Sequence, residues 1–393
     1  MKLGWAKARL DECAEIVAGA TPSTSVDSYW GGDVCWATPK DMSELEDAYI
    51  SDTPRKLTRA GLENCAATVL PSGSVLFSSR APIGHVAVNT VPMATNQGFK
   101  SFVPKPERVV AKFLYWWLRT NRTYLESLGN GATFKEVSKA IVSRIEISLP
   151  PLAEQRRIAE VLDRAEALRA KRSKALAQLD SLTQSLFLDL FGDPISNPKG
   201  FPKRKVSEVV SRLTNGFVGP TRDIYHETGV PYLLARHVKA NRLKFDGKTF
   251  VSETFNRKHS KSILKAGDVL LVQSGHVGES AVVPIEHEGH NCHAMIVITP
   301  RPELLTGHFL SQLFSTEALR RAFGGIETGI TLAHLNCRDV RELSIPIPPI
   351  SLQREFACRV TAVEKLKTAH RASLAELDAL FATLQHRAFR GEL

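Results

Sequence analysis

The side chains best suited to chemistry in this sequence are long hydrogen-bonding residues beside turns. Arg80 precedes Pro82 and Gly84, and Lys135 follows a Gly-Ala-Thr-Phe turn, so each side chain can project from a rigid support. Arg, Lys, Gln and Asn can each contact two atoms of a DNA base edge at once. Contacts from Ser, Thr and Lys also suit phosphates, which position a protein without specifying sequence.

Ten residues form this candidate DNA-binding group, five in each half of the chain. The first half holds Lys40, Arg80, Gln97, Lys100 and Lys135, and the second half holds Arg236, His237, Gln273, His276 and His293. Any one of them can equally be a solvated surface residue, so the prediction concerns the group.

Motifs for catalysis by this chain are not found in the sequence. An adenine methyltransferase needs an Asn/Asp-Pro-Pro-Tyr/Phe motif to hold a flipped base, and neither Asn197-Pro198-Lys199 nor Asp193-Pro194 supplies it. There is no GxxxxGK[ST] loop for ATP phosphates. The chain is therefore predicted to be a non-catalytic protein.

The densest group of metal-ligand residue types is His290-Asn291-Cys292-His293. It reads equally well as the polar end of a strand, and no second ligand pair at zinc spacing accompanies it. We expect neither a metal nor a cofactor in this chain.

Composition favours a polyanionic partner inside the cell. The formal net charge is +10 and the pI about 9.3, which favours nucleic acid without proving it. The six cysteines are scattered, as in proteins of a reducing compartment. No signal peptide and no apolar run of about 20 residues occurs, so we expect a cytoplasmic protein without a membrane span.

The chain contains an internal repeat with a period of 198 residues. Leu149-Pro150-Pro151-Leu152 recurs as Ile347-Pro348-Pro349-Ile350, and Gln155-Arg156 recurs as Gln353-Arg354. Upstream, Gly73-Ser74-Val75-Leu76 corresponds to Gly267-Asp268-Val269-Leu270 in the same order. A repeated order of motifs indicates two copies of one architecture.

The repeat divides the chain into four segments of an α+β protein. Residues 1–150 and 193–348 are predicted as globular domains, and residues 151–192 and 349–393 as long helices. Strands are expected at 75–77, 85–88, 269–272 and 281–283, and helices near 111–128 and 307–323. Strands and helices do not alternate regularly, which argues against a doubly wound parallel sheet.

Both long helices carry a heptad seam of apolar residues. The seam positions are Ile158, Leu162, Ala165, Leu176, Leu179 and Leu186 in the first, and Phe356, Val360, Val363, Leu374, Leu377, Phe381 and Leu384 in the second. A helix of about 55–60 Å cannot bury such a seam alone. We expect the two helices to pack on each other as an antiparallel coiled coil, although a core helix of a bundle would show the same pattern.

Basic residues interrupt both seams at the same place. Arg169 and Arg172 interrupt the first, and Lys367 and His370 the second. They could fray the seam, or they could accept acidic groups from another subunit. They are therefore the predicted partner-binding residues.

Two similar domains joined by stiff helices suit a ligand with two sites at a fixed separation. DNA is such a ligand, because sites about 34 Å apart present the same face of the groove. A protein that reads DNA at two separate places is the leading hypothesis from the residues alone. A coiled-coil scaffold without a DNA role is the alternative, and salt-dependent DNA binding would distinguish the two.

The complete pattern resembles the specificity subunit (HsdS) of type I restriction–modification systems. The resemblance rests on the Pro-Pro and Gln-Arg motifs before each long helix, on residues 70–84 and 95–100, on residues 329–336, and on the linker at 191–200. It covers essentially the whole chain.

The resemblance implies that each globular segment is a target recognition domain for one half of a split DNA target. It implies a coiled coil that sets the spacer and binds two adenine-methyltransferase subunits, which use S-adenosylmethionine. Restriction subunits with motor and nuclease activity, which need ATP and Mg²⁺, join afterwards. A fused methyltransferase–nuclease partner is the alternative within the family. Because Ser78-Ser79-Arg80 aligns with Gln273-Ser274-Gly275-His276, we expect two different half-sites.

Overall fold

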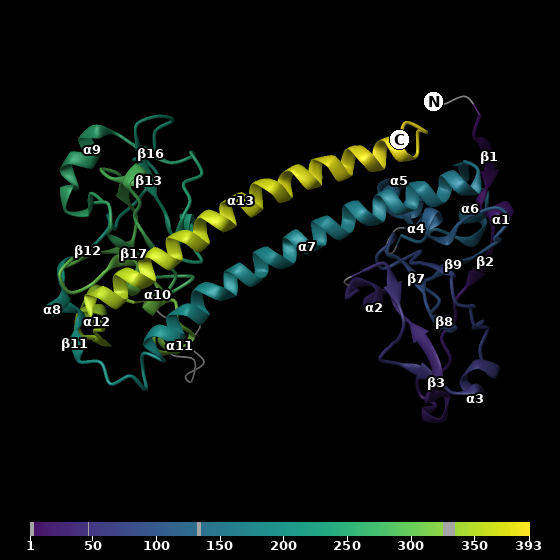
Figure 1. The fold of residues 1–393 in the computed structure, drawn as a ribbon, viewed down its shortest axis with the longest axis horizontal. Coiled ribbons are helices and arrows are strands. Elements are labelled where there is room, and N and C mark those ends of the chain that lie inside the picture. The colour runs from purple at the N-terminus through teal and green to yellow at the C-terminus, as the bar shows by residue number, and fades with distance from the viewer. Residues whose placement is uncertain (1–3, 46, 132–134, 325–334) are drawn as a thin grey trace. The chain divides into compact units, whose positions relative to one another are not determined.

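The computed structural model describes residues 4–45, 47–131, 135–324 and 335–393. The chain forms two compact units (Figure 1). Unit 1 comprises residues 1–172 and 373–393, and unit 2 comprises residues 173–372. Each unit therefore contains one strand-rich domain and one end of each long helix.

The domain of unit 1 combines short strands with short helices. Its strands are β1 (Ala6–Arg9), β2 (Ala14–Ala18), β3 (Trp30–Ala37), β4 (Tyr49–Ile50), β5 (Lys56–Leu57), β6 (Val75–Phe77), β7 (Val86–Asn89), β8 (Met93–Thr95), β9 (Lys100–Pro104) and β10 (Glu146–Leu149). Its helices are α1 (Leu10–Cys13), α2 (Pro39–Ser43), α3 (Arg59–Glu63), α4 (Ala111–Thr120), α5 (Arg122–Ser127) and α6 (Lys139–Arg144). The sheet orders are β2-β9-β6-β7-β4, β5-β3-β8 and β1-β10.

The domain of unit 2 is built in the same way. Its strands are β11 (Lys203–Lys205), β12 (Val210–Asn215), β13 (Val230–Leu233), β14 (Val238–Lys239), β15 (Arg242–Leu243), β16 (Phe250–Val251), β17 (Val269–Val272), β18 (Ser280–Val282), β19 (Asn291–Cys292), β20 (Met295–Pro300) and β21 (Ser344–Pro346). Its helices are α8 (Val206–Val209), α9 (Glu253–Lys258), α10 (Gly307–Phe314), α11 (Glu317–Gly324) and α12 (Cys337–Glu342). The sheet orders are β12-β20-β17-β18, β16-β13-β19, β11-β21 and β14-β15.

The two domains share one topology, as the sequence repeat predicts. The order β2-β9-β6-β7 corresponds to β12-β20-β17-β18, and the mixed sheet β5-β3-β8 corresponds to β16-β13-β19. In both mixed sheets the central strand is antiparallel to one neighbour and parallel to the other. The mixed strands and helices confirm the α+β prediction.

A glycine turn before the central strand is repeated with its conformation. Gly73 has φ 86° and Gly267 has φ 87°, in the left-handed region that favours glycine. Each donates its N–H to a carbonyl of the following hairpin, Gly73 to Asn89 and Gly267 to Val283, both at 2.8 Å. The two sequence segments therefore correspond because both need a glycine with positive φ at the same turn.

The helices predicted near 111–128 and 307–323 form, but each is broken once. Asn121 ends α4 and donates its side-chain amide to the carbonyl of Trp117 at 2.8 Å. Thr316 lies between α10 and α11, and its hydroxyl oxygen accepts from the N–H of Leu319 at 3.4 Å. Side chains that bond the backbone locally compete with the helical ladder, which explains both breaks.

The two long helices, α7 (Leu152–Phe191) and α13 (Ile350–Ala388), occupy the predicted ranges. In unit 1 the helices run antiparallel, since Arg169 bonds Asp378 while the earlier Arg157 bonds Leu393, just beyond the end of α13. They also run antiparallel in unit 2, where Asp180 bonds Lys367 while the later Phe187 packs on the earlier Phe356. Gly192, with φ 74°, ends α7 at the predicted linker.

Each helix pair is anchored in the core of its own domain. In unit 1, Ile158 and Leu162 of α7 and Phe381 of α13 pack with Phe113 and Trp116 of α4. In unit 2, Phe356 and Phe187 pack with Phe309 of α10. Phe187 rather than the predicted Leu186 is fully buried at this end, because 3.6 residues per turn do not match a strict heptad. No helix in the described ranges is both long and apolar enough to cross a membrane.

Candidate nucleic-acid interface

Three segments that carry candidate residues of unit 1 meet at one edge of the domain. The N–H of Ser79 donates to the carbonyl of Gly98 at 2.7 Å, which joins the segment of Arg80 to that of Gln97. A side chain at Gly98 would meet Pro39 at 3.3 Å and Arg80 at 3.6 Å. Lys40, Arg80 and Gln97 therefore project from adjacent segments, and Lys40 and Gln97 are exposed.

Lys100 lies beneath this surface rather than on it. Its side chain is buried, with Nζ 3.0 Å from Glu136 and 3.5 Å from the hydroxyl of Ser79. Glu136 also lies 3.5 Å from the guanidinium of Arg80. Lys100 thus holds the carboxylate that orients Arg80, a supporting position that the sequence does not distinguish from a DNA contact.

Lys135 joins the same edge. It is exposed and precedes Glu136, whose backbone forms a bridge with that of Arg80. Residues 132–134 of the preceding turn lie outside the described residues. Lys40, Arg80, Gln97 and Lys135 are therefore the exposed or half-exposed group of this domain.

In unit 2 the candidates divide between surface and interior. Arg236 is exposed, with Nε 3.2 Å from Asp246. His237 is buried; its Nδ1 accepts from the N–H of Leu234 at 3.0 Å and its Nε2 lies 3.0 Å from Asp246. His237 and Arg236 therefore lie beside the same carboxylate, that of Asp246.

The other three candidates follow neighbouring strands. Val272 pairs with Met295, so Gln273 and His293 leave the adjacent ends of β17 and β20. Gln273 is buried, His276 is exposed, and His293 is half-buried beside the ring of Phe217. The motif at residues 329–334 lies outside the described residues.

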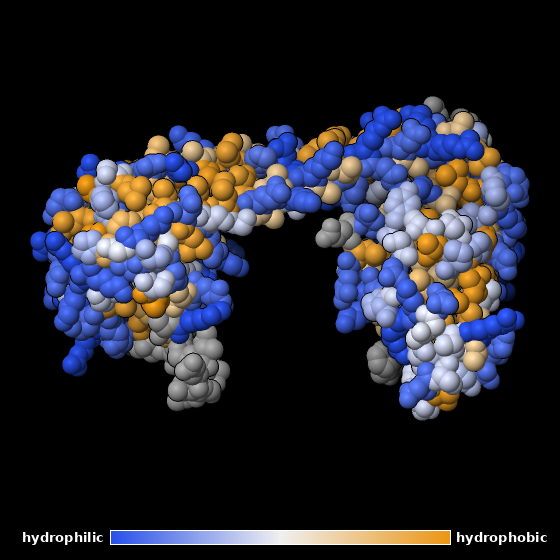
Figure 2. All heavy atoms as spheres, turned by 60° about the horizontal axis from the view of Figure 1, so that its bottom comes forward, coloured by the Kyte–Doolittle hydropathy of each residue, from blue (hydrophilic) through white to orange (hydrophobic). Residues whose placement is uncertain are grey.

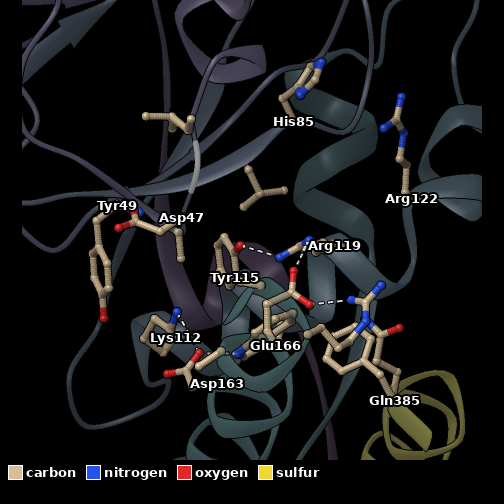
Figure 3. A pocket seen from close by; sticks show the side chains of 18 of the residues that line it. Asp47, Tyr49, His85, Lys112, Tyr115, Arg119, Arg122, Asp163, Glu166 and Gln385 are labelled. Carbon is tan, nitrogen blue, oxygen red and sulfur yellow. Dashed lines mark hydrogen bonds and ion pairs between the residues drawn. The ribbon is translucent and has the colours of Figure 1, made fainter. Parts of the chain in front are cut away.

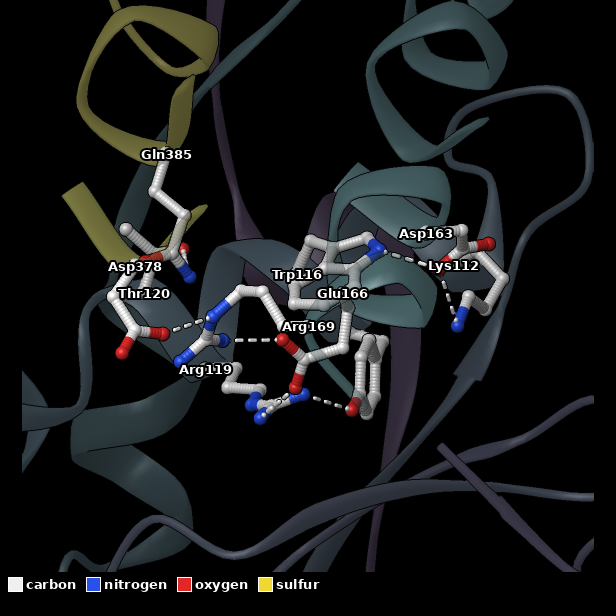
Figure 4. Close-up of polar contacts among 10 residues, drawn as sticks. Lys112, Trp116, Arg119, Thr120, Asp163, Glu166, Arg169, Asp378 and Gln385 are labelled. Carbon is white, nitrogen blue, oxygen red and sulfur yellow. Dashed lines mark hydrogen bonds and ion pairs between the residues drawn. The ribbon is translucent and has the colours of Figure 1, made fainter. Parts of the chain in front are cut away.

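The basic residues of the long-helix seam have acidic neighbours within the chain (Figure 4). Arg169 donates to Asp378 at 2.6 Å and also to Glu166. Lys367 is buried and lies 3.0 Å from Asp180. Arg172 and His370 also take part in interactions. Arg169 and Lys367 are thus each paired with an aspartate of the opposite long helix.

A cavity of about 850 Å³ lies beside this seam in unit 1, between α4, α7, α13 and the segments 42–45, 47–49 and 84–86 (Figure 3). Three ion pairs form part of its wall: Lys112 with Asp163, Arg119 with Glu166, and Arg169 with Asp378. The first two pairs join α4 of the domain to α7, and the third joins α7 to α13.

A repeated buried glutamine is the clearest feature that sequence reasoning missed. Gln155 accepts the N–H of Val110 at 2.8 Å and donates to the carbonyls of Arg108 and Pro150 at 3.0 and 2.9 Å. The Gln-Arg pair was visible as a mark of the repeat, but sequence alone did not show that its amide is buried.

Gln353 makes the same three bonds in the other repeat. It accepts from the N–H of Thr306 at 2.9 Å and donates to the carbonyls of Leu304 and Pro348 at 3.0 and 2.9 Å. In unit 1 the glutamine at the start of α7 is therefore bonded to the segment that precedes α4. In unit 2 the glutamine at the start of α13 is bonded in the same way to the segment that precedes α10.

Burial lowers the pKa of several histidines, because the interior disfavours the imidazolium form. Five of them lie in unit 2, namely His237, His259, His290, His293 and His308, and His85 lies in unit 1. Below their ordinary pKa of 6.5 the unfolded chain binds more protons than the folded chain. Stability is then lost as the pH falls from 6.5 through the lowered folded values.

We therefore expect unit 2 to be less stable at about pH 5.5 than at about pH 7.5, and by more than unit 1. The five tryptophans all lie in unit 1, so tryptophan fluorescence reports its unfolding while far-UV circular dichroism reports both units. In urea at the lower pH, the dichroism transition should begin before the fluorescence transition. Equal shifts of both transitions, or none, would contradict this expectation.

Comparison with known proteins agrees with the presence of two repeated domains in this chain. A family model described as "Type I restriction modification DNA specificity domain" matches residues 2–179 and again 198–379. The specificity subunit of type I restriction enzyme MjaIX from Methanocaldococcus jannaschii is 28% identical over 373 residues, or 90% of this chain and 85% of the relative. The EcoDI specificity subunit of Escherichia coli is 22% identical over 370 residues, covering 84% and 81%.

Solved structures share the fold over nearly the whole chain. A chain from a study of complex assembly and conformational transition of the type I R-M system has a TM-score of 0.60 at 19% identity, covering 100% of this chain and 99% of the other. The type I restriction–modification S subunit from M. genitalium has a TM-score of 0.58 at 14% identity, covering 99% and 96%. With two matched domains of one topology in tandem, this chain belongs to the DNA specificity family of type I restriction–modification systems.

Proposed function

We propose that this chain is the specificity subunit of a type I complex and that it reads a split, asymmetric DNA target. The observation that carries the proposal is the pair of domains with one topology and different exposed side chains at equivalent loops. Arg80 follows β6 and His276 follows the equivalent strand β17, while Lys40 follows β3 and Arg236 follows the equivalent strand β13. Guanidinium and imidazole groups differ in charge and in donor geometry, so equivalent loops would select different base pairs.

The long helices offer two equivalent surfaces for partner subunits. Leu168 and Leu182 of α7 are 54% and 38% exposed, and Leu366 and Leu380 of α13 are 52% and 51% exposed. Leu168 and Leu380 lie in unit 1, and Leu366 and Leu182 lie in unit 2, so each unit holds one exposed leucine from each long helix. Hydrophobic residues are visible among hydrophilic ones along the long helices in Figure 2.

The repeat period of 198 residues relates Leu168 to Leu366 and Leu182 to Leu380. One partner can therefore bind twice by the same contacts. The partner we propose is an adenine-methyltransferase subunit, bound in two copies, one to Leu168 and Leu380 of unit 1 and one to Leu366 and Leu182 of unit 2. Methylation with S-adenosylmethionine and ATP-driven restriction then belong to the methyltransferase and restriction subunits, while this chain selects the sequence.

The proposal is tested by methylome sequencing of cells that express this chain with the methyltransferase gene beside it. We expect methyladenine on both strands of a split, asymmetric motif, and its loss when this chain is deleted. Arg80→Ala should relax selection in one half of the motif by about 10-fold or more, since a bidentate base contact contributes about 1–3 kcal/mol. His276→Ala should affect the other half alone.

Arg59→Ala is the matched control, because Arg59 is an exposed arginine of the same domain whose neighbour is Glu63 of its own helix. It should leave both halves of the motif unchanged. A palindromic motif would contradict the proposal that the two domains recognise different half-sites. An Arg80→Ala variant that weakens both halves equally would show a general phosphate contact or a loss of folding instead of base selection.

A further inference from the structure

In unit 1 a cluster of charges joins the recognition domain to both long helices (Figure 4). Arg119 of α4 lies 2.7 Å from one carboxylate oxygen of Glu166 and donates to the hydroxyl of Tyr115 at 2.9 Å. The other oxygen of Glu166 accepts from Arg169, which also bonds Asp378 of α13 at 2.6 Å. Glu166 is thus shared between the domain and the helix pair.

In unit 2 a second cluster has the same plan. Arg242 of β15 lies 2.6 Å from Glu364 of α13. Glu364 lies 3.1 Å from Lys367, and Lys367 lies 3.0 Å from Asp180 of α7. One carboxylate of a long helix again receives both a domain arginine and the basic residue of the seam.

The helix residues of the two clusters are equivalent, but the two arginines are not. The 198-residue period relates Glu166 to Glu364, Arg169 to Lys367, and Asp180 to Asp378. Arg119 comes from the helix that follows the sheet, whereas Arg242 comes from a short strand within the domain. The two domains therefore contact equivalent carboxylates through arginines at positions that are not equivalent. A single contact inherited from a common ancestor of the two repeats would instead use equivalent arginines.

A contact between an arginine and a carboxylate fixes the relative orientation of the two elements that carry them, in addition to holding them together. A guanidinium is planar and its donors form a fixed fork, so a bond to a carboxylate constrains the angle between the elements that carry them. The Arg119 and Arg242 side chains are 40% and 29% exposed, which is less solvent screening than a fully exposed pair has. The apolar cores already hold each domain to the helices, so the charges add orientation more than attachment.

We infer that Arg119 and Arg242 are positioning residues that fix the orientation of each recognition domain on the helix pair and thereby set the accepted spacing of the half-sites. The inference rests on the proposed reading of a split target. Each additional base pair moves a half-site by about 3.4 Å and turns it by about 35°, with 10–10.5 base pairs per turn. A domain held at a fixed angle cannot follow that movement, and a loosened one can.

The experiment measures binding of the assembled complex, with its methyltransferase subunits, to DNA duplexes that differ only in spacer length. The panel holds the native spacer and spacers one base pair shorter and longer. Arg119→Met and Arg242→Met keep most of the apolar stem and remove the charge. We expect each to reduce discrimination against the wrong spacers by about tenfold, which corresponds to one charge-assisted hydrogen bond. Selection of bases within each half-site should stay unchanged.

Four further variants separate positioning from folding. Arg119→Lys keeps the charge without the fork and should restore part of the discrimination. Glu166→Gln removes the carboxylate that both Arg119 and Arg169 contact, so it should reduce spacer discrimination at least as much as Arg119→Met. The double variant should be no worse than Glu166→Gln alone, because Arg119 has then already lost that carboxylate. Arg164→Met is the control, since Arg164 is an 81% exposed arginine of α7 paired with Glu160 of its own helix.

Two results would overturn the inference. One is an Arg119→Met or Arg242→Met complex that discriminates spacers as sharply as the unchanged complex. The other is a uniform loss of binding to every duplex, which is the signature of lost folding alone. If the unchanged complex itself shows no preference between split targets, then the proposed function fails, and that outcome is separate from both.

Discussion

Replacing Gln155 by methionine is expected to lower the free energy of unfolding of unit 1 by about 3 kcal/mol or more. The change leaves the N–H of Val110 and the carbonyls of Arg108 and Pro150 without their partner in a buried position. Each unsatisfied buried group costs about 1–3 kcal/mol. Urea denaturation followed by tryptophan fluorescence measures the effect, because the tryptophans lie in unit 1.

The second repeat and an exposed glutamine provide matched comparisons. Gln353→Met should destabilise unit 2 by a similar amount, which far-UV circular dichroism detects, and leave the fluorescence transition nearly unchanged. Gln155→Glu should also destabilise, since a carboxylate cannot donate to two carbonyls. Gln178→Met, at an exposed position of α7, should be neutral within about 0.5 kcal/mol. Equal stability of Gln155→Met and Gln178→Met would disprove the structural role.

The second large effect is expected at the exposed leucines of the long helices. Replacing Leu168 and Leu380 of unit 1 together by serine should remove one of two bound methyltransferase subunits, and replacing Leu366 and Leu182 of unit 2 as well should remove both. Burying a leucine side chain contributes about 1.5–3 kcal/mol, so losing two weakens binding by about 100-fold or more. Native mass spectrometry of the assembled complex counts the subunits directly.

Exposed apolar residues outside the long helices provide the control. Val218 and Ile285 are 63% and 71% exposed in unit 2, so Val218→Ser with Ile285→Ser removes a similar apolar area. This variant should keep two subunits. If the leucine variants also keep two subunits, or if the control loses one, the proposed docking surface is wrong.

The architecture of this protein could be predicted from its sequence to a large extent. The recurrence of the Pro-Pro and Gln-Arg motifs indicated two copies of one topology, and the heptads gave the ranges of both long helices. These features depend on short-range patterning, in which a proline stops a helix and an apolar period sets its buried face. The breaks at Asn121 and Thr316 were missed because they depend on which local hydrogen bond the side chain makes.

Sequence did less well at distinguishing surface residues from supporting ones. Lys100, His237 and Gln273 have the right residue types for DNA contacts, yet the fold buries all three. Two of them, Lys100 and His237, lie 3.0 Å from Glu136 and Asp246, which are themselves beside half-exposed or exposed arginines. The residue type fixes which hydrogen bonds a polar side chain is able to form. The partner that it finds in the folded protein depends on how distant segments pack together.

The sequence alone determined the tandem repeat, the α+β domains and the long helical segments. Each was recognised from short motifs or periodic patterns, whose residues are neighbours in the chain. The tertiary structure decided which charges are shared between elements. Arg119 meets a carboxylate 47 positions away, and Arg242 meets Glu364 across 122 positions. Such pairs leave no periodic pattern in the sequence, since they arise only when separately encoded elements pack against the same face of a helix.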